Sequence, residues 1–189
     1  GFFIIVVVTG LFLLFMFFSE NKRQVTIIIP ESEGWNQTIN GKSAPNDTPM
    51  MLPGMIAPVT LTATEARVTD TEQVIGITIG GEHRAYIVNA FAPLGQKVIN
   101  DLINEIPLAI TYCDIYERAR VFTSTERGEY LHVGLGGWMN KEMFFYFENV
   151  RFSQSSENAP LPDYPYIITT WGQWLEVHPD SRIYLGDGV

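Results

Sequence analysis

Apolar and polar residues divide the chain into one short continuous apolar segment and a long segment in which they alternate. Residues 2–18 carry no charge, and fourteen of these seventeen residues are Phe, Ile, Val or Leu. A helix of that length spans about 26 Å, close to the ~30 Å hydrocarbon core of a bilayer. The pattern therefore predicts a transmembrane helix over residues 1–19, with residues 2–18 in contact with lipid. A signal peptide is the alternative, but no A-x-A-like cleavage site follows the apolar run.

Residues 20–60 are dense in Asn, Gly, Pro, Ser and Thr, which is typical of an extended linker. The segment nevertheless contains apolar side chains that a solvated spacer would avoid, namely Trp35, Met50, Met51 and Met55. We expect these side chains to lie against the protein's own domain or against a neighbouring subunit. The methionines could instead bind a soft metal such as Cu(I), but adaptable packing is the favoured explanation.

From residue 61 onward, short runs rich in β-branched and aromatic residues predict a β-rich domain over residues 61–189. Gly80-Gly81 separates two such runs, 74–79 and 83–88, and this spacing predicts a β-hairpin. The further predicted strands are 97–101, 107–113, 119–123, 129–135, 142–152 and 182–185. Residues 102–106 could alternatively extend a helix.

Two short helical segments interrupt the predicted strands. Thr62 with Glu65, and Thr170 with Gln173, have the spacing of a capping box, in which the first residue caps the turn that follows. Pro179 ends the second segment. The predicted fold class is thus a mainly β (β-rich α+β) soluble domain with one or two short helices, tethered by the N-terminal transmembrane helix.

The stretch MFFYF, residues 143–147, predicts a strand that is apolar on both faces. Alternation places Met143, Phe145 and Phe147 on one face and Phe144 and Tyr146 on the other. Such a strand is either covered on both sides within the domain, or its second face meets a partner or the bilayer surface. Phe144 and Tyr146 are therefore candidate contact residues.

Charge and cysteine content exclude several classes of function. The formal net charge is −9 and no basic run exists beyond Lys22-Arg23, which argues against a nucleic-acid partner. Cys113 is the single cysteine, so the chain forms no intramolecular disulfide and no cysteine-based zinc site. The roughly 170 residues after the apolar segment suit one domain.

Four stretches in order suggest a known family. They are VIGITIGGEHRAYIV, KVINDLINEIPLAITYCDIYERARVF, LHVGLGG and TTWGQWLEVHPDSRIY, within residues 61–185. Together they resemble the bacterial family catalogued as domain of unknown function 3179. The resemblance implies an exported or membrane-tethered protein, hence a bacterial inner-membrane location with the domain in the periplasm. Lys22 and Arg23 favour the cytoplasmic side under the positive-inside rule, but they are only two charges.

The chain departs from the pattern that the resemblance implies. The family pattern carries a His-Glu pair where this chain has Gln96 and Lys97, and a second cysteine where this chain has Tyr116. Two of the polar groups suited to metal or redox chemistry are therefore replaced. Of these reactive positions, the pattern's first cysteine, Cys113, is the one that remains.

Cys113 is the candidate around which a catalytic site could form. A nucleophilic thiol needs a thiolate-favouring environment and an imidazole base. His83 and His132 both lie in predicted strands and could face Cys113 across a sheet, so these three residues are the candidate catalytic set. The favoured explanation is nevertheless that Cys113 is a small apolar residue closing a strand.

Other candidate sites have weaker support. The three histidines could bind zinc together with Asp101 or Asp114, but no two of them have a local ligand spacing. The two aspartates could also act as a general acid/base pair. Residues 134–137, GLGG, lack the Lys-Ser/Thr of a phosphate loop and instead predict a tight turn or bulge. We expect neither a metal ion nor a cofactor.

These patterns favour a non-catalytic function. We expect a membrane-anchored accessory or assembly subunit, whose β-rich domain packs on other membrane-protein subunits of a larger complex, respiratory or photosynthetic for instance. Thr9 and Gly10 offer a small surface on which a neighbouring helix could dock. The alternative is a degenerate or unusual enzyme or redox protein centred on Cys113. A third class, a small-ligand-binding module, would show a pocket lined by aromatic residues such as Trp138 and Trp171.

Overall fold

The structure is a computed structural model that describes residues 35–39, 42–45 and 48–186. The strands are β1 Trp35–Ile39, β2 Lys42–Pro45, β3 Thr48–Pro53, β4 Met55–Ile56, β5 Leu61–Thr62, β6 Gln73–Ile79, β7 Glu82–Ile87, β8 Val98–Ile103, β9 Ile106–Cys113, β10 Arg118–Thr123, β11 Gly134–Met139, β12 Glu142–Phe147, β13 Val150–Ser153, β14 Ile167–Thr170 and β15 Arg182–Tyr184. The helices are α1 Trp171–Val177 and two short 3-10 segments, η2 Val88–Phe91 and η3 Leu94–Gln96. The prediction of a mainly β domain with a short helix is confirmed for the described residues.

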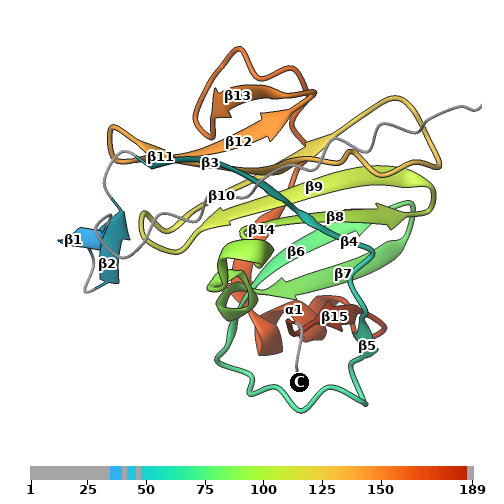
Figure 1. Cartoon of the computed structure of the whole chain (residues 1–189). Coiled ribbons are helices and arrows are strands. Elements are labelled where there is room, and N and C mark those ends of the chain that lie inside the picture. Colours follow the sequence, from blue (N-terminus) through green and yellow to red (C-terminus); the bar gives the residue numbers. More distant parts are fainter. Residues whose placement is uncertain (1–34, 40–41, 46–47, 187–189) are drawn as a thin grey trace, which may run out of the picture.

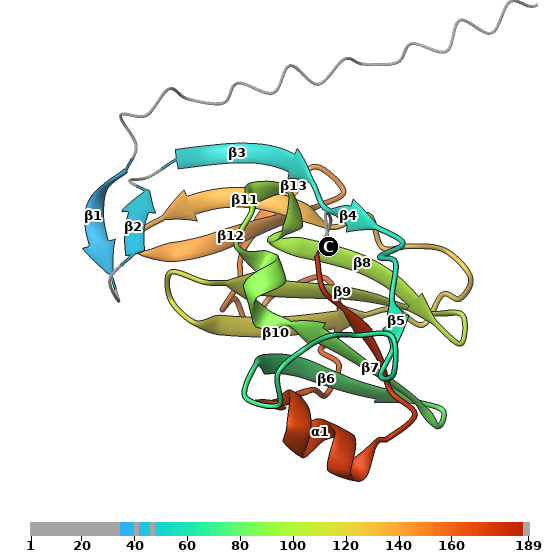
Figure 2. The same ribbon diagram turned by 90° about the horizontal axis from the view of Figure 1, so that it is seen from below.

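Three sheets and one helix are stacked as layers (Figures 1 and 2). The outer sheet has the strand order β13-β12-β11-β3, the middle sheet β10-β9-β8-β4, and the helix-side sheet β14-β6-β7-β15-β5. Helix α1 packs on the face of the helix-side sheet that points away from the middle sheet. The far face of the outer sheet therefore lies at the opposite end of the stack from α1.

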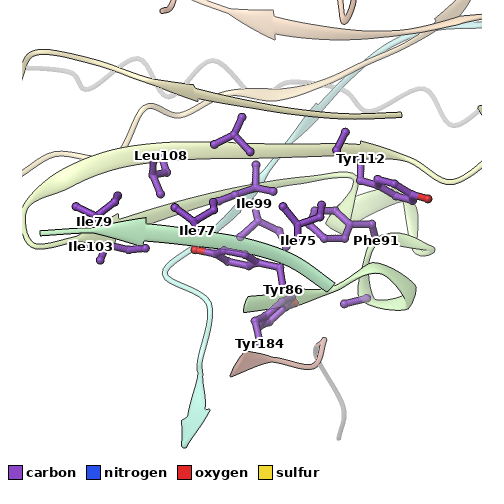
Figure 3. Close-up of a cluster of buried hydrophobic side chains, with 14 residues drawn as sticks. Ile75, Ile77, Ile79, Tyr86, Phe91, Ile99, Ile103, Leu108, Tyr112 and Tyr184 are labelled. Carbon is purple, nitrogen blue, oxygen red and sulfur yellow. The ribbon is translucent and has the colours of Figure 1, made fainter. Parts of the chain in front are cut away.

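Period-two alternation distributes side chains between the layers. On β6, Ile75, Ile77 and Ile79 point toward the middle sheet, whereas Val74 and Gly76 lie on the α1 side. Figure 3 shows this core, in which side chains of β8 and β9 meet those of β6 and β7. Strand β9 is buried at every position after the first, as expected for a strand covered on both faces.

Local turn chemistry accounts for the hairpins. The predicted hairpin across Gly80-Gly81 is confirmed, with Ile79 paired to Glu82 and positive φ angles of 57° and 87° at the two glycines. Between β8 and β9, Asn104 and Glu105 have φ angles of 51° and 62°, the left-handed pair that a tight two-residue hairpin needs. The alternative of a helix over residues 102–106 is therefore wrong.

Part of the predicted linker belongs to the sheets. Strand β3 pairs with β11 at the edge of the outer sheet, and β4 pairs in parallel with β8 at the edge of the middle sheet. Pro49 and Pro53 made this stretch look like a linker, but an edge strand tolerates proline because one side needs no ladder hydrogen bonds. The residues from 48 to 56 thus pack on their own domain.

Two other predicted strands have different bounds. Residues 129–133 are not a strand, because His132 takes a φ of 53° and β11 begins only at Gly134. The predicted strand 142–152 is two strands, β12 and β13, joined by a turn at Glu148 and Asn149. No Gly or Pro marks these positive-φ positions in the sequence, so the sequence pattern did not reveal where the strands end.

The two capping-box predictions have different outcomes. Thr170 and Gln173 form a complete capping box at the start of α1, which confirms that helix. Thr62 and Glu65 also bond to each other, with 2.8 Å from Thr62 N to Glu65 Oε2, but they close only a turn after β5. The structure thus contains one α-helix within the described residues.

Within the described residues, no helix is both long and apolar enough to cross a bilayer. The predicted transmembrane helix, including Thr9 and Gly10, lies outside these residues.

Candidate functional site

Cys113 ends β9 inside the core between the middle and outer sheets. Its exposed fraction is 0%, and it belongs to a cluster with Val98, Ala109 and Phe122. A thiol in this position cannot meet a substrate from solvent without an opening of the core. The geometry therefore matches the favoured explanation, an apolar residue closing a strand.

Neither candidate base accompanies Cys113. His83, on β7, lies on the α1 side of the helix-side sheet, where its Nδ1 is 3.0 Å from Thr78 Oγ1. Its ring stacks on His178 with centroids 3.9 Å apart. Partial burial, and then the neighbouring His83, lower the pKa of His178. The helix-side and middle sheets thus separate this histidine pair from Cys113.

His132 lines a cavity with a volume of about 390 Å³. Its neighbours Leu131 and Val133 both pack in the Cys113 cluster, while the left-handed backbone at His132 turns its own side chain outward. The cavity is also lined by three glutamates and three aromatic residues, Glu126, Glu129, Glu148, Tyr130, Tyr146 and Phe147. No group of three or more potential metal ligands occurs among the described residues.

Lys97, one of the positions that differ from the family pattern, lies beside the strand that ends in Cys113. The backbone N–H of Tyr112 donates to Lys97 O at 3.1 Å, which brings the start of β8 beside the end of β9. There the Lys97 ammonium, with 2% of the residue exposed, donates to Asp114 Oδ1 and to Ala92 O. Lys97, which stands at one of the two positions that the resemblance assigns to the His-Glu pair, therefore takes part in a largely buried ion pair with Asp114.

Asp101 is a structural acceptor. Its carboxylate accepts from Arg84 Nη1 at 2.7 Å, from Tyr86 Oη at 2.6 Å and from Leu102 N at 2.7 Å. Burial, and then the Asp101 charge, raise the pKa of Tyr86. The Asp101 network faces the helix-side sheet, whereas Asp114 lies beyond β9 next to Lys97. The structure does not bring the two aspartates together as an acid/base pair.

The GLGG stretch is a bulge, as predicted, and it supports an aromatic surface. The register of β11 shifts between Leu135 and Gly137. A Cβ at Gly134 would lie 2.4 Å from Tyr146 Cε1, so the Tyr146 ring lies directly against the β11 backbone. Here the glycine serves the close approach of a ring rather than a phosphate.

Alternation on β12 is as predicted, and it leaves two aromatic rings on the far face of the outer sheet. Met143 and Phe145 are buried in the core, and Phe144 and Tyr146 are half-buried on the other side. Arg151, the cross-strand neighbour of Tyr146, places its guanidinium 4.9 Å from the Phe144 ring centre. Sequence reasoning missed Arg151, although the alternation in β13 places residue 151 on this face.

The methionines and tryptophans divide between core and surface. Met50 and Met55 pack against the two main cores, whereas Met51 is 37% exposed on the far face of the outer sheet. Trp138 and Trp171 are buried and do not line the cavity. Trp35 begins β1. We call Met51, Phe144, Tyr146 and Arg151 the outer face.

Fold and site define a layered β domain in which Cys113 is buried and the far face of the outer sheet carries two half-buried aromatic side chains. The chain belongs to the family described as Protein of unknown function (DUF3179), whose model matches residues 50–185. This confirms the resemblance, and the match begins within β3. No curated protein and no solved structure matches the chain.

Proposed function

We propose that the protein is a non-catalytic, membrane-anchored accessory subunit, whose β domain docks on a partner membrane protein through the outer face. Residues 2–18 would anchor it in a bacterial inner membrane, with the domain on the periplasmic side. The single observation that carries the proposal is the outer face itself, because its aromatic and methionine side chains cover no part of the domain's own core.

The two ends of the stack differ in a way that supports this proposal. At one end, α1 covers the helix-side sheet with Trp171 and Trp174. At the other end, Phe144 and Tyr146 are half-buried and Met51 is 37% exposed, and no helix of the described residues covers them. Aromatic residues, Met and Arg are enriched at protein interfaces.

The alternative of an enzyme or redox protein centred on Cys113 has less support. Such a site needs an accessible thiolate with a base beside it. Cys113 is fully buried in an apolar cluster, and His83 and His132 lie elsewhere.

Co-purification of the full chain tests the proposal. The tagged protein is extracted from membranes in mild detergent, and its partners are identified by mass spectrometry for wild type and for Phe144→Ser. The matched control is Val177→Ser, an exposed apolar residue on α1 at the other end of the stack. We expect Phe144→Ser to reduce partner recovery about 10-fold or more, as for a buried aromatic hot spot, and Val177→Ser to retain it. Thermal unfolding of both variants checks that each remains folded.

Two results would contradict the proposal. Recovery of the same partner in equal amount with Phe144→Ser would exclude the outer face as the interface. Absence of any stoichiometric partner for the wild-type chain would exclude an accessory role.

A further inference from the structure

The Arg151 guanidinium is partly buried, and the described residues offer it no carboxylate to offset the free-energy cost of that burial. Its guanidinium stacks over Phe144 at 4.9 Å, and its Nε and Nη2 are shielded from solvent. Among the described residues, neither nitrogen has a hydrogen-bond acceptor. Partial burial lowers the pKa of Arg151, and no neighbouring carboxylate offsets that effect. Nη1 is left as the nitrogen that an acceptor outside the chain can reach.

Two other partly buried arginines of the domain each have a carboxylate partner, Arg84–Asp101 at 2.7 Å and Arg120–Asp163 at 2.6 Å. The exposed Arg118 pairs with Glu142 at 3.0 Å. Glu142, at the start of β12, bonds Arg118, Ser153 and Ser155 instead of Arg151. Arg151 therefore differs from the partly buried arginines above, because no described carboxylate pairs with it. Burying an unpaired charge is costly.

We propose that the partner subunit presents an Asp or Glu carboxylate to Arg151, beside an apolar side chain that packs on Phe144 and Tyr146. This inference rests on the proposed function and specifies the chemistry of the docking segment. An arginine whose stem and face are already ordered on an aromatic ring loses little conformational freedom when it binds a carboxylate. Charge complementarity at a desolvated site then gives specificity as well as affinity.

The anion belongs to a protein rather than to the bilayer. Anionic lipid surfaces are recognised by clusters of about four to eight Lys and Arg residues. The strand pair from residue 141 to 153 carries Lys141 and Arg151 against Glu142 and Glu148, so its formal charge is balanced. The whole chain has a net charge of −9, which an anionic bilayer repels.

Site-specific cross-linking in membranes tests this inference with the full chain. Met51, which is 37% exposed on the outer face, is replaced by the photo-reactive residue p-benzoylphenylalanine. The cross-linked product is analysed in the otherwise wild-type chain and together with Arg151→Met or Arg151→Lys. Arg67→Met, at an exposed position on the loop after β5, is the matched control for loss of one positive charge.

We expect a cross-link to a protein segment that contains Asp or Glu. Arg151→Met should reduce its yield about 30-fold or more, because truncating one partner of a buried charge pair typically has that effect. Arg151→Lys should give an intermediate yield, since lysine keeps the charge but not the guanidinium plane that stacks over Phe144. Arg67→Met should leave the yield unchanged. Arg151→Glu combined with reversal of the partner's acidic residue should restore the cross-link.

A second readout separates a docking role from a structural one. Because Arg151→Met removes shielded nitrogens and keeps an apolar stem on Phe144, the purified variant should unfold at a temperature equal to or up to about 4 °C above wild type. A purely structural arginine would instead lower that temperature.

The other outcomes each exclude something specific. A protein cross-link that Arg151→Met leaves unchanged overturns the carboxylate inference while the proposed accessory role stands. A cross-link to phospholipid overturns the inference in favour of a membrane-facing surface. No cross-linked product of any kind would contradict both proposals.

Discussion

Replacing Asp101 by asparagine removes one charge from a largely buried polar network of the domain. The Asp101 carboxylate, in a residue with 4% exposure, accepts hydrogen bonds from Arg84, Tyr86 and Leu102. An asparagine would present an amide nitrogen where a carboxylate oxygen stands. The Arg84 guanidinium and the Leu102 N–H cannot accept from that nitrogen, so Asp101→Asn places a donor against a donor on either side.

The expected loss in free energy of unfolding for Asp101→Asn follows from the charge that is left without a partner. Arg84, with 14% of its side chain exposed, would retain only its long contact to Leu102 O at 3.4 Å. Breaking a buried ion pair by removing one member costs about 3–5 kcal/mol. For a domain of this size each kcal/mol lowers the unfolding temperature by about 2–4 °C, so Asp101→Asn should lower it by about 10 °C.

Thermal unfolding of the purified full chain, followed by circular dichroism at neutral pH, measures this shift. Tyr86→Phe removes one hydrogen bond to the carboxylate and should cost less, about 1.5–3 kcal/mol. Glu126→Gln, at an exposed position, is the control and should stay within about 0.5 kcal/mol of wild type. An Asp101→Asn variant that unfolds within about 2 °C of wild type would refute the claim that this network stabilises the stack.

Three further predictions follow from other parts of the structure. Gly134→Ala should destabilise the domain by about 1–3 kcal/mol in denaturant unfolding, because the added Cβ would lie 2.4 Å from both Leu52 O and Tyr146 Cε1. Unchanged stability would mean that the Tyr146 ring does not lie on β11. Cys113 should react with a thiol reagent only after unfolding, because it is fully buried, and rapid labelling of the native protein would contradict this. The lowered pKa of His178, stacked on His83, means that the unfolded chain binds a proton more readily than the folded one. The stability that neutral His178 contributes is fully present above its unfolded pKa of about 6.5 and is lost as the pH falls toward the lower folded pKa. The unfolding temperature should therefore drop between about pH 7.5 and pH 5, and less so in His178→Gln. An equal drop in both proteins would show that other groups cause it.

Local signals predicted the elements whose chemistry lies within a few residues. Gly80-Gly81 between two β-branched runs predicted the β6–β7 hairpin, and the Thr170–Gln173 capping box predicted α1. Alternation in residues 143–147 correctly divided the side chains of β12 between two faces, with Met143 and Phe145 on one and Phe144 and Tyr146 on the other. In each case the energies that select the conformation come from neighbours in sequence.

Predictions failed where a distant segment decided the conformation. Strands β3 and β4 exist because β11 and β8 offer them unpaired edges, and neither partner is near in sequence. The Asn100 side chain fixes this arrangement by bonding Met55 O and Val133 O, at 3.1 and 2.9 Å. A linker-like composition cannot report such pairing, because proline is compatible with both a linker and an edge strand.

The candidate sites show the same division. That Cys113 is a small apolar residue at a strand end could be inferred from the run before it. The buried ion pair between Lys97 and Asp114 depends on the register of β8 and β9. Among the described residues Arg151 has no carboxylate partner, because Glu142 forms its ion pair with Arg118.

The sequence by itself determined the family, the β-rich class, the β6–β7 hairpin, helix α1 and the division of β12 into two faces. Only the tertiary structure decided which face is covered, which charges are paired and which cation is left for a partner. The physical reason is range: hydrogen bonds in turns and the period of a strand act between adjacent residues, whereas burial and ion pairing depend on which distant surface lies opposite.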